Sequence, residues 1–134
     1  GVSNFDLPLL KALEARASVQ THAVQNQKDL VNKDSEVVEY CRQNGIFYQA
    51  YASLRNHETS QEEEWVEARK QASAVAAETG HSVHQIVLRS LLDEGIGVIP
   101  RSRNPEHIQE NLNVIYWELS ENSLKALGVD HDEL

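Results

Sequence analysis

The chain has 134 residues, of which 40% are hydrophobic and 25% charged, and its formal net charge at pH 7 is −9. A chain of this length can bury one modest core, and its negative charge argues against nonspecific binding to nucleic acid or to an anionic membrane. No segment approaches the ~20 consecutive apolar residues of a membrane span, and the one cysteine, Cys41, cannot form an internal disulfide. We therefore expect a protein of the reducing cytoplasm, although the last residues, His131–Leu134, also spell an endoplasmic-reticulum retrieval signal.

Hydrophobic spacing and turn residues predict helices that alternate with strands along the chain. The expected helices cover residues 6–17, 34–44, about 61–79, 83–93, 105 onward and about 121–127. The expected strands lie in the later part of residues 19–27, at 46–51 and at 96–99. Such an alternation is typical of a parallel α/β sheet, and no linker divides the chain into two domains.

Polar residues with capping spacing mark several helix starts. Asp6 precedes the first apolar-periodic segment and is expected to cap it. Ser60 with Glu63, and Ser82 with Gln85, have the three-residue spacing of a capping box. Both pairs therefore predict a helix that begins directly after the serine.

Several side chains that could react or bind a metal are interpreted as structural. Cys41 lies on the apolar face of a predicted helix, which favours a core position over a nucleophile. His81 and His84 lack further ligands at a suitable spacing, so they predict surface histidines rather than a metal site. Trp65 and Trp117 are expected to be packing residues.

Residues 97–111, with the sequence GVIPRSRNPEHIQEN, combine an apolar run, a basic loop and a helix start. Asn104 suits the N-cap of this helix and Pro105 suits its first position. The first-turn N–H groups would point at the loop beside Arg101 and Arg103, an arrangement that favours an anion such as phosphate. An ordinary strand–helix junction with solvated arginines is the alternative.

The sequences of four segments resemble motifs of the aldo-keto reductases, which are NADPH-dependent oxidoreductases built on a TIM barrel. Residues 97–111 resemble the family's IPKS-x-x-P-x-x-I-x-E-N motif, and residues 1–5 match its GVSNF. Residues 26–27 match its NQ pair, residues 49–54 resemble its AYSPL, and Glu118–Ser120 follow in family order. The resemblance covers residues 1–134 but only the second half of the family's domain, so it implies half of a TIM (β/α)8 barrel.

The resemblance also implies which residues surround the nicotinamide of the cofactor. Ser3, Asn4 and Gln27 would hydrogen-bond its carboxamide, which offers both a donor and an acceptor. Tyr51 would stack on the ring, and Leu54 belongs to the same motif. Ordinary turn chemistry at the first two positions and a core role for the tyrosine are the structural alternatives.

A second group of residues would hold the adenosine end. Arg101 stands where the family usually has lysine, and with Ser102 it would bind the adenosine 2′-phosphate, assisted by Arg103. Glu110 and Asn111 match positions that contact the adenine edge. NADPH is therefore the expected cofactor.

Some positions depart from the family pattern. His107 falls where the family commonly has arginine beside the adenosine, so NADH stays open as an alternative cofactor. Ser53 and Arg55 replace a proline and a glycine of the loop expected over the pyrophosphate, and Lys28 and Asp29 follow the NQ pair in place of valine and glutamate.

The family's catalytic aspartate, tyrosine, lysine and histidine come from the first half of its barrel, and none of those motifs occurs here. We therefore assign no catalytic residue and no metal ligand, and we expect the isolated chain to be inactive. One hypothesis is the cofactor-binding half of an NADPH-dependent carbonyl reductase that lacks its proton-transfer residues. The other is a non-catalytic half-barrel that acts as a binding or self-assembling module.

The expected partners, besides a nicotinamide cofactor, are a second copy of the chain in a homodimer or the missing N-terminal half of the barrel. Edge strands of a half-barrel present unpaired backbone groups that closure would remove. The side chains expected to point inward, where they would lack opposing partners, are Val24, Gln27, Ala50 and Val98.

Overall fold

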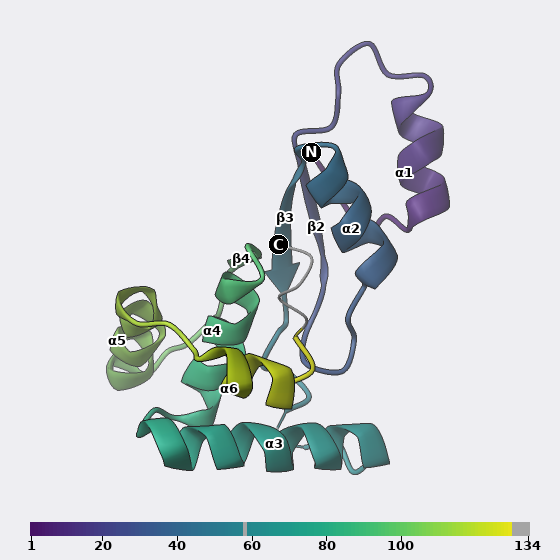
Figure 1. Cartoon of the computed structure of the whole chain (residues 1–134). Helices are drawn as coiled ribbons and strands as arrows, with labels where there is room; N and C mark the ends of the chain where they lie inside the picture. The colour runs from purple at the N-terminus through teal and green to yellow at the C-terminus, as the bar shows by residue number, and fades with distance from the viewer. Residues whose placement is uncertain (58, 130–134) are drawn as a thin grey trace.

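The computed structural model describes residues 1–57 and 59–129, and its strands form one parallel sheet. The strands are β1 (Val2–Ser3), β2 (Ala23–Gln27), β3 (Phe47–Tyr51) and β4 (Gly97–Val98). They lie in the order β1-β2-β3-β4, and every neighbouring pair is parallel; Figure 1 labels β2, β3 and β4. The predicted parallel α/β sheet is thereby confirmed, and the tail His131–Leu134 lies outside the described residues.

Helices follow or connect all four strands. They are α1 (Leu7–Glu14), α2 (Ser35–Gln43), α3 (Glu63–Thr79), α4 (Val83–Asp93), α5 (Pro105–Asn113) and α6 (Glu121–Ala126), with a short 3-10 helix, η1 (Val114–Tyr116). Helix α2 packs on β3 and α4 packs on β4, while α1 and α5 lie on opposite flanks of the sheet (Figure 1). Within the described residues, no helix is long and apolar enough to cross a membrane.

The two faces of the sheet differ in burial because successive side chains of a strand point to opposite sides. Val24 and Asn26 of β2, and Tyr48 and Ala50 of β3, are buried against the helices. The intervening residues are half-buried or exposed, and we call the side that they form the open face. Its members in β2 and β3 are Ala23, Gln25, Gln27, Phe47, Gln49 and Tyr51.

The prediction that Val24, Ala50 and Val98 point away from the helices is wrong. Val24 and Ala50 have no exposed surface and belong to the core between sheet and helices, and Val98 packs against the same cluster. Gln27 alone of the four lies on the open face. Since it is an odd number of residues from Val24, the two side chains must point to opposite sides of β2.

The apolar core consists of two clusters. The first lies under the sheet and contains Leu10, Val24, Val37, Cys41, Ile46, Tyr48, Ala50, Leu91 and Ile96. The second lies among α3, α4 and α6 and contains Leu30, Ala72, Val75, Ile86, Val87, Leu119, Leu124, Leu127 and Val129. The core positions predicted for Cys41 and Trp65 are confirmed, since each is at most 5% exposed. Trp117 is half-buried, and its ring stacks on His81 with the ring centroids 3.7 Å apart.

Three of the predicted helix starts are confirmed by their hydrogen bonds. Asp6 Oδ1 accepts from the backbone N–H of Leu9 at 2.9 Å, and Asn104 Oδ1 accepts from that of Glu106 at 2.9 Å. The capping box of Ser82 is complete in both directions. These bonds satisfy N–H groups that have no partner inside the helix.

The capping box predicted for Ser60 and Glu63 is wrong. Helix α3 begins at Glu63 with Glu62 as its N-cap residue, and no side chain caps it. Ser60 Oγ instead accepts from the N–H of Glu62 at 3.4 Å, within the turn before the helix. The serine lies two residues too early for a capping box, which needs it at the N-cap itself.

Two predicted elements are shorter in the structure. Helix α1 ends at Glu14 rather than at Ala17, and the carboxylate of Glu14 accepts from the N–H of Thr21 as the chain turns toward β2. Strand β4 is limited to Gly97–Val98, and Ile99, expected in a buried strand, is 46% exposed. Because β4 is an edge strand, its end packs against a neighbour on one side alone.

Candidate functional site

The carboxyl ends of β1, β2 and β3 gather three of the residues predicted to contact nicotinamide. The hydroxyl of Tyr51 donates to Asn4 Oδ1 at 2.5 Å, and Gln27 lies opposite Tyr51 in the strand register. Ser3 directly precedes Asn4, and its hydroxyl donates to the backbone carbonyl of Gln25 at 2.6 Å. The geometry therefore places an amide, a phenol and a second amide side by side at the end of the sheet where ligands of α/β barrels bind.

Two residues at these strand ends adopt a left-handed backbone conformation that favours glycine. Asn4 follows β1 with φ of 58°, and Ala52 follows β3 with φ of 56°. Asparagine tolerates this conformation, but for alanine it costs about 1–2 kcal/mol. Such strain occurs at functional sites, where the surrounding structure enforces it. Here the turn at Ala52 directs the following residues into a cleft.

That cleft has a volume of about 430 Å³ and opens between the ends of β3 and β4. It is lined by Tyr51, Ala52, Ser53, Leu54, Arg55, Leu88, Ile99, Pro100 and Arg101. Ser53 is 7% exposed, and its hydroxyl has no hydrogen-bond partner in the described part of the chain. A buried hydroxyl without a partner loses its hydration and gains nothing in return, and this hydroxyl is not exposed to the cleft.

The basic loop that forms one wall of the cleft leads into α5. The N–H of Asn104 donates to Ser102 Oγ at 3.1 Å, and Asn104 in turn caps the helix. Arg101 and Arg103 are exposed, and neither forms an ion pair with a described residue. Two arginines beside a helix N-terminus form a positive site on a chain that is otherwise acidic.

The structure does not bring all the predicted cofactor residues into this cleft. His107, Glu110 and Asn111 lie on α5, and none of them lines it. The backbone carbonyl of Glu110 accepts from Gln85 Nε2 at 3.0 Å, which ties α5 to α4. These three positions therefore lie along the helix beyond the basic loop, outside the enclosed part of the site.

A polar network beneath the sheet holds the strand ends in place. Asn26 exchanges two hydrogen bonds with the backbone of Phe5, at 3.2 and 2.7 Å, and its amide also donates to Asp34. Asp34 accepts from the hydroxyl of Tyr48 at 2.6 Å as well. Burial, followed by this hydrogen bond to Asp34, raises the pKa of Tyr48 above its ordinary value. Asn26 thus positions the loop after β1, while its neighbour Gln27 faces the open side.

The two residues after the NQ pair turn away from the site. Lys28 is 2% exposed, and its ammonium lies 3.2 Å from Glu94 Oε2 and donates to the backbone carbonyl of Lys33 at 2.9 Å. Asp29 is equally buried, and its carboxylate accepts from the N–H groups of Val31 and Asn32. The charged groups of both residues, which depart from the family pattern, therefore have partners inside the chain.

Sequence reasoning noted Ser53 as a substitution but did not identify it as a site residue. A serine in place of the family's proline gives no sign of its burial, which depends on the left-handed turn at Ala52. The contact between Asn4 and Tyr51 was likewise hidden, because 47 positions separate the two residues. In the described parts of the chain, no group of three or more histidine, cysteine, aspartate or glutamate side chains could hold a metal ion.

Comparison with known proteins places this fold and this site in one family. A family model described as the aldo/keto reductase family matches residues 1–128. The chain belongs to the aldo-keto reductase family. Among its relatives, the glycerol 2-dehydrogenase (NADP(+)) of Hypocrea jecorina is 33% identical over 95% of this chain, which corresponds to 40% of that protein.

Solved structures agree with this half-length match. A thermostable aldo-keto reductase in complex with the inhibitor epalrestat superposes with a TM-score of 0.84 and 30% identity, over 95% of this chain and 46% of that one. An aldo-keto reductase of Bombyx mori in complex with NADP gives a TM-score of 0.80 and 26% identity, over 95% of this chain and 42% of that one. This aldo-keto reductase chain therefore spans less than half the length of these relatives, and its sheet is half of a TIM barrel.

Proposed function

We propose that this chain is the cofactor-binding half of an NAD(P)H-dependent carbonyl reductase and prefers NADPH. The observation that carries the proposal is the cleft between β3 and β4, which is lined by Arg101 of the basic loop that leads into α5. A phosphate-bearing ligand in the cleft would neutralise the charge of Arg101. The names of the NADP(+)-dependent and NADP-bound relatives support the same class of ligand.

The residues at the strand ends fit the other end of such a cofactor. A nicotinamide supplies a hydride when it is bound. Asn4 and Gln27 present amides that can pair with its carboxamide, and the ring of Tyr51 would lie against one of its faces. The hydrogen bond from Tyr51 to Asn4 fixes the orientation of both side chains before the ligand arrives.

In this proposal the tyrosines at the described strand ends supply no proton. The hydroxyls of Tyr48 and Tyr51 donate to Asp34 and Asn4, so both protons are already committed to internal acceptors. Reduction of a carbonyl needs its oxygen to be protonated or stabilised. The isolated chain should therefore bind cofactor weakly and consume no NADPH in the presence of a reactive aldehyde. Turnover that disappears in Tyr51→Phe would contradict this assignment.

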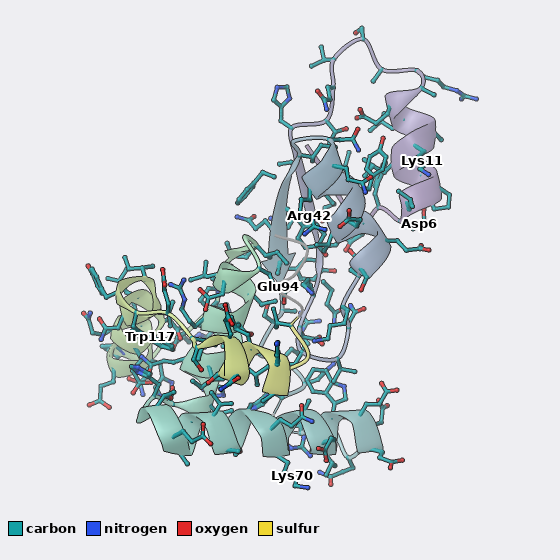
Figure 2. The ribbon with its side chains drawn as sticks, in the orientation of Figure 1. Asp6, Lys11, Arg42, Lys70, Glu94 and Trp117 are labelled. Carbon is teal, nitrogen blue, oxygen red and sulfur yellow. The ribbon has the colours of Figure 1, made fainter. Side chains whose placement is uncertain are left out.

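Calorimetric titration of the 134-residue chain with NADPH and with NADH tests the cofactor assignment. A charge-assisted contact is worth about 1.5–3 kcal/mol. Arg101→Ala should therefore weaken NADPH roughly tenfold to a hundredfold, and NADH far less. Lys70→Ala is the matched control, because this exposed cation points away from the sheet on α3 (Figure 2). Equal losses for both cofactors, or no binding of either, would refute the proposal.

A further inference from the structure

The side chain of Lys33, in the loop between β2 and α2, lines two cavities of the structure. The first has a volume of about 690 Å³, and Figure 2 labels Arg42 and Glu94, which line it from α2 and from the end of α4. The second has a volume of about 590 Å³ and lies between this loop, α3 and the end of α6. No described residue of β1, α1, β4 or α5 lines either cavity, so both lie away from the two flanks of the sheet.

The ammonium of Lys33 has little to stabilise its charge. The side chain is half-buried, and its Nζ atom donates to the backbone carbonyl of Leu127 at 3.4 Å, which is long for such a hydrogen bond. Among the described residues, no carboxylate lies close enough to this ammonium to form an ion pair. An ammonium that loses hydration without gaining a counter-ion favours its neutral form.

A second ammonium increases this effect. Lys28 Nζ donates to the backbone carbonyl of Lys33 at 2.9 Å and lies 3.2 Å from Glu94 Oε2, so the nearby carboxylate is already paired. Burial, followed by the charge of Lys28, lowers the pKa of Lys33, while Glu94 and Asp29 oppose this shift. A desolvated lysine beside another cation is activated as a nucleophile, because more of its amine is neutral at pH 7.

The other charged groups around Lys33 indicate which ligands the cavities favour. In the first cavity, Glu39 and Arg42 of α2 pair with each other. In the second cavity, α3 presents three exposed carboxylates, which repel an anionic ligand. The cavity therefore favours an uncharged ligand over an anion. These carboxylates belong to Glu63, Glu64 and Glu67.

The second cavity also offers apolar surface. Leu30 and Leu127 line it and are 7% and 5% exposed, and Val31 and Ala68 extend the same wall. Its volume falls within the range of roughly 300–1,000 Å³ that is typical of small-molecule sites. An uncharged molecule with a short apolar chain would bury that chain against this wall and turn its polar end toward Lys33.

We propose that Lys33 forms a Schiff base with a small uncharged aldehyde whose apolar chain enters the cavity beside α3. The neutral amine adds its lone pair to the carbonyl carbon, and a C=N bond replaces the C=O bond. Both hydrogens of the nitrogen leave with the carbonyl oxygen as water, so the step needs no oxidant or reductant. The proposal involves neither the nicotinamide cofactor nor Arg101 and is independent of the proposed function.

Reductive trapping of the 134-residue chain with butanal and cyanoborohydride tests the proposal, and peptide mass spectrometry locates the modified lysines. Lys70, whose side chain is 79% exposed on α3, is the internal standard in the same sample. At pH 7 we expect at least about threefold more adduct at Lys33 than at Lys70, although Lys33 is the less exposed. This ratio should fall as the pH approaches 10.5, where ordinary lysine side chains also lose their proton.

Two variants of α3 distinguish reaction in the cavity from general reactivity of the amine. Ala68→Leu fills part of the cavity and should lower the adduct at Lys33 by at least about threefold, without changing that at Lys70. Ala74→Leu, at an exposed position of the same helix, is the matched control and should change neither.

Three results would overturn the proposal. They are no excess of adduct at Lys33 over Lys70, a ratio that does not fall with rising pH, and unchanged trapping at Lys33 in folded Ala68→Leu. Circular dichroism checks that each variant has kept its fold. The first two results come from the wild-type chain, so they decide the proposal even where a variant does not fold.

Discussion

Lys28 carries a positive charge into the interior, and its partner Glu94 offers a sharp test of the structure. The side chain of Lys28 is 2% exposed, while that of Glu94 is 19% exposed and lies near the middle of the molecule in Figure 2. Glu94→Gln keeps the shape of the partner and removes its charge. The ammonium would then retain the carbonyl of Lys33 but no counter-ion.

Breaking a buried ion pair by removing one partner costs about 3–5 kcal/mol. Because Glu94 keeps some contact with water, we expect about 3 kcal/mol, a large fraction of the roughly 5–15 kcal/mol that holds a domain folded. Urea denaturation at pH 7 measures the loss. Glu78→Gln, at an exposed position of α3, is the control and should change stability by no more than about 0.5 kcal/mol. Replacing both members, Lys28→Met with Glu94→Leu, should recover most of the loss, since a packed apolar pair needs no counter-ion. A loss below about 1 kcal/mol in Glu94→Gln would refute the buried pair.

Two further predictions concern the backbone and the charge of the same region. Ala52→Gly should stabilise the chain by up to about 1 kcal/mol in urea denaturation, because relief of the left-handed strain outweighs the entropy of glycine. Ala50→Gly in β3 should destabilise it, and a loss in both variants would contradict the strain. Burial, and then the charge of Lys28, lowers the pKa of Lys33 below 10.5, so the folded state binds fewer protons than the unfolded state between the lowered pKa and 10.5. The free energy of unfolding should therefore rise with pH through that window. Lys33→Met should be more stable than the wild type at pH 7, and its stability should no longer rise with pH there. A less stable variant whose stability still rises with pH would contradict the prediction.

The elements that could be predicted from the sequence are those fixed by local chemistry. The helix of residues 83–93 was predicted with its capping box because Ser82 and Gln85 satisfy each other within one turn. The alternation of strands with helices along the sequence also indicated the parallel sheet. At α3 the spacing of Ser60 and Glu63 indicated a capping box, but the structure has Glu62 at the N-cap. Local rules do not decide such cases, because the start of α3 depends on how the preceding loop is held.

The site was predicted by motif and completed by tertiary structure. The motifs brought Asn4, Gln27 and Tyr51 into consideration, and the parallel register explains why residues so far apart in sequence meet. The burial of Ser53 could not be predicted, because it follows from a left-handed turn that alanine disfavours. The face of the sheet on which Val24 lies could have been predicted, because side chains alternate along β2 and Val24 must therefore point to the side opposite Gln27.

Helix α4 contributes to both core clusters, with Leu91 in the one beneath the sheet and Ile86 in the one beside α3 and α6. A segment shared in this way cannot open while either cluster stays closed, so its backbone amides are protected by the sum of the two local unfolding free energies. Leu88, on the same helix, forms one wall of the ligand cleft. One side of the cleft is therefore anchored to a helix held by both cores, while the opposite side, at Ser53, belongs to the turn that follows β3.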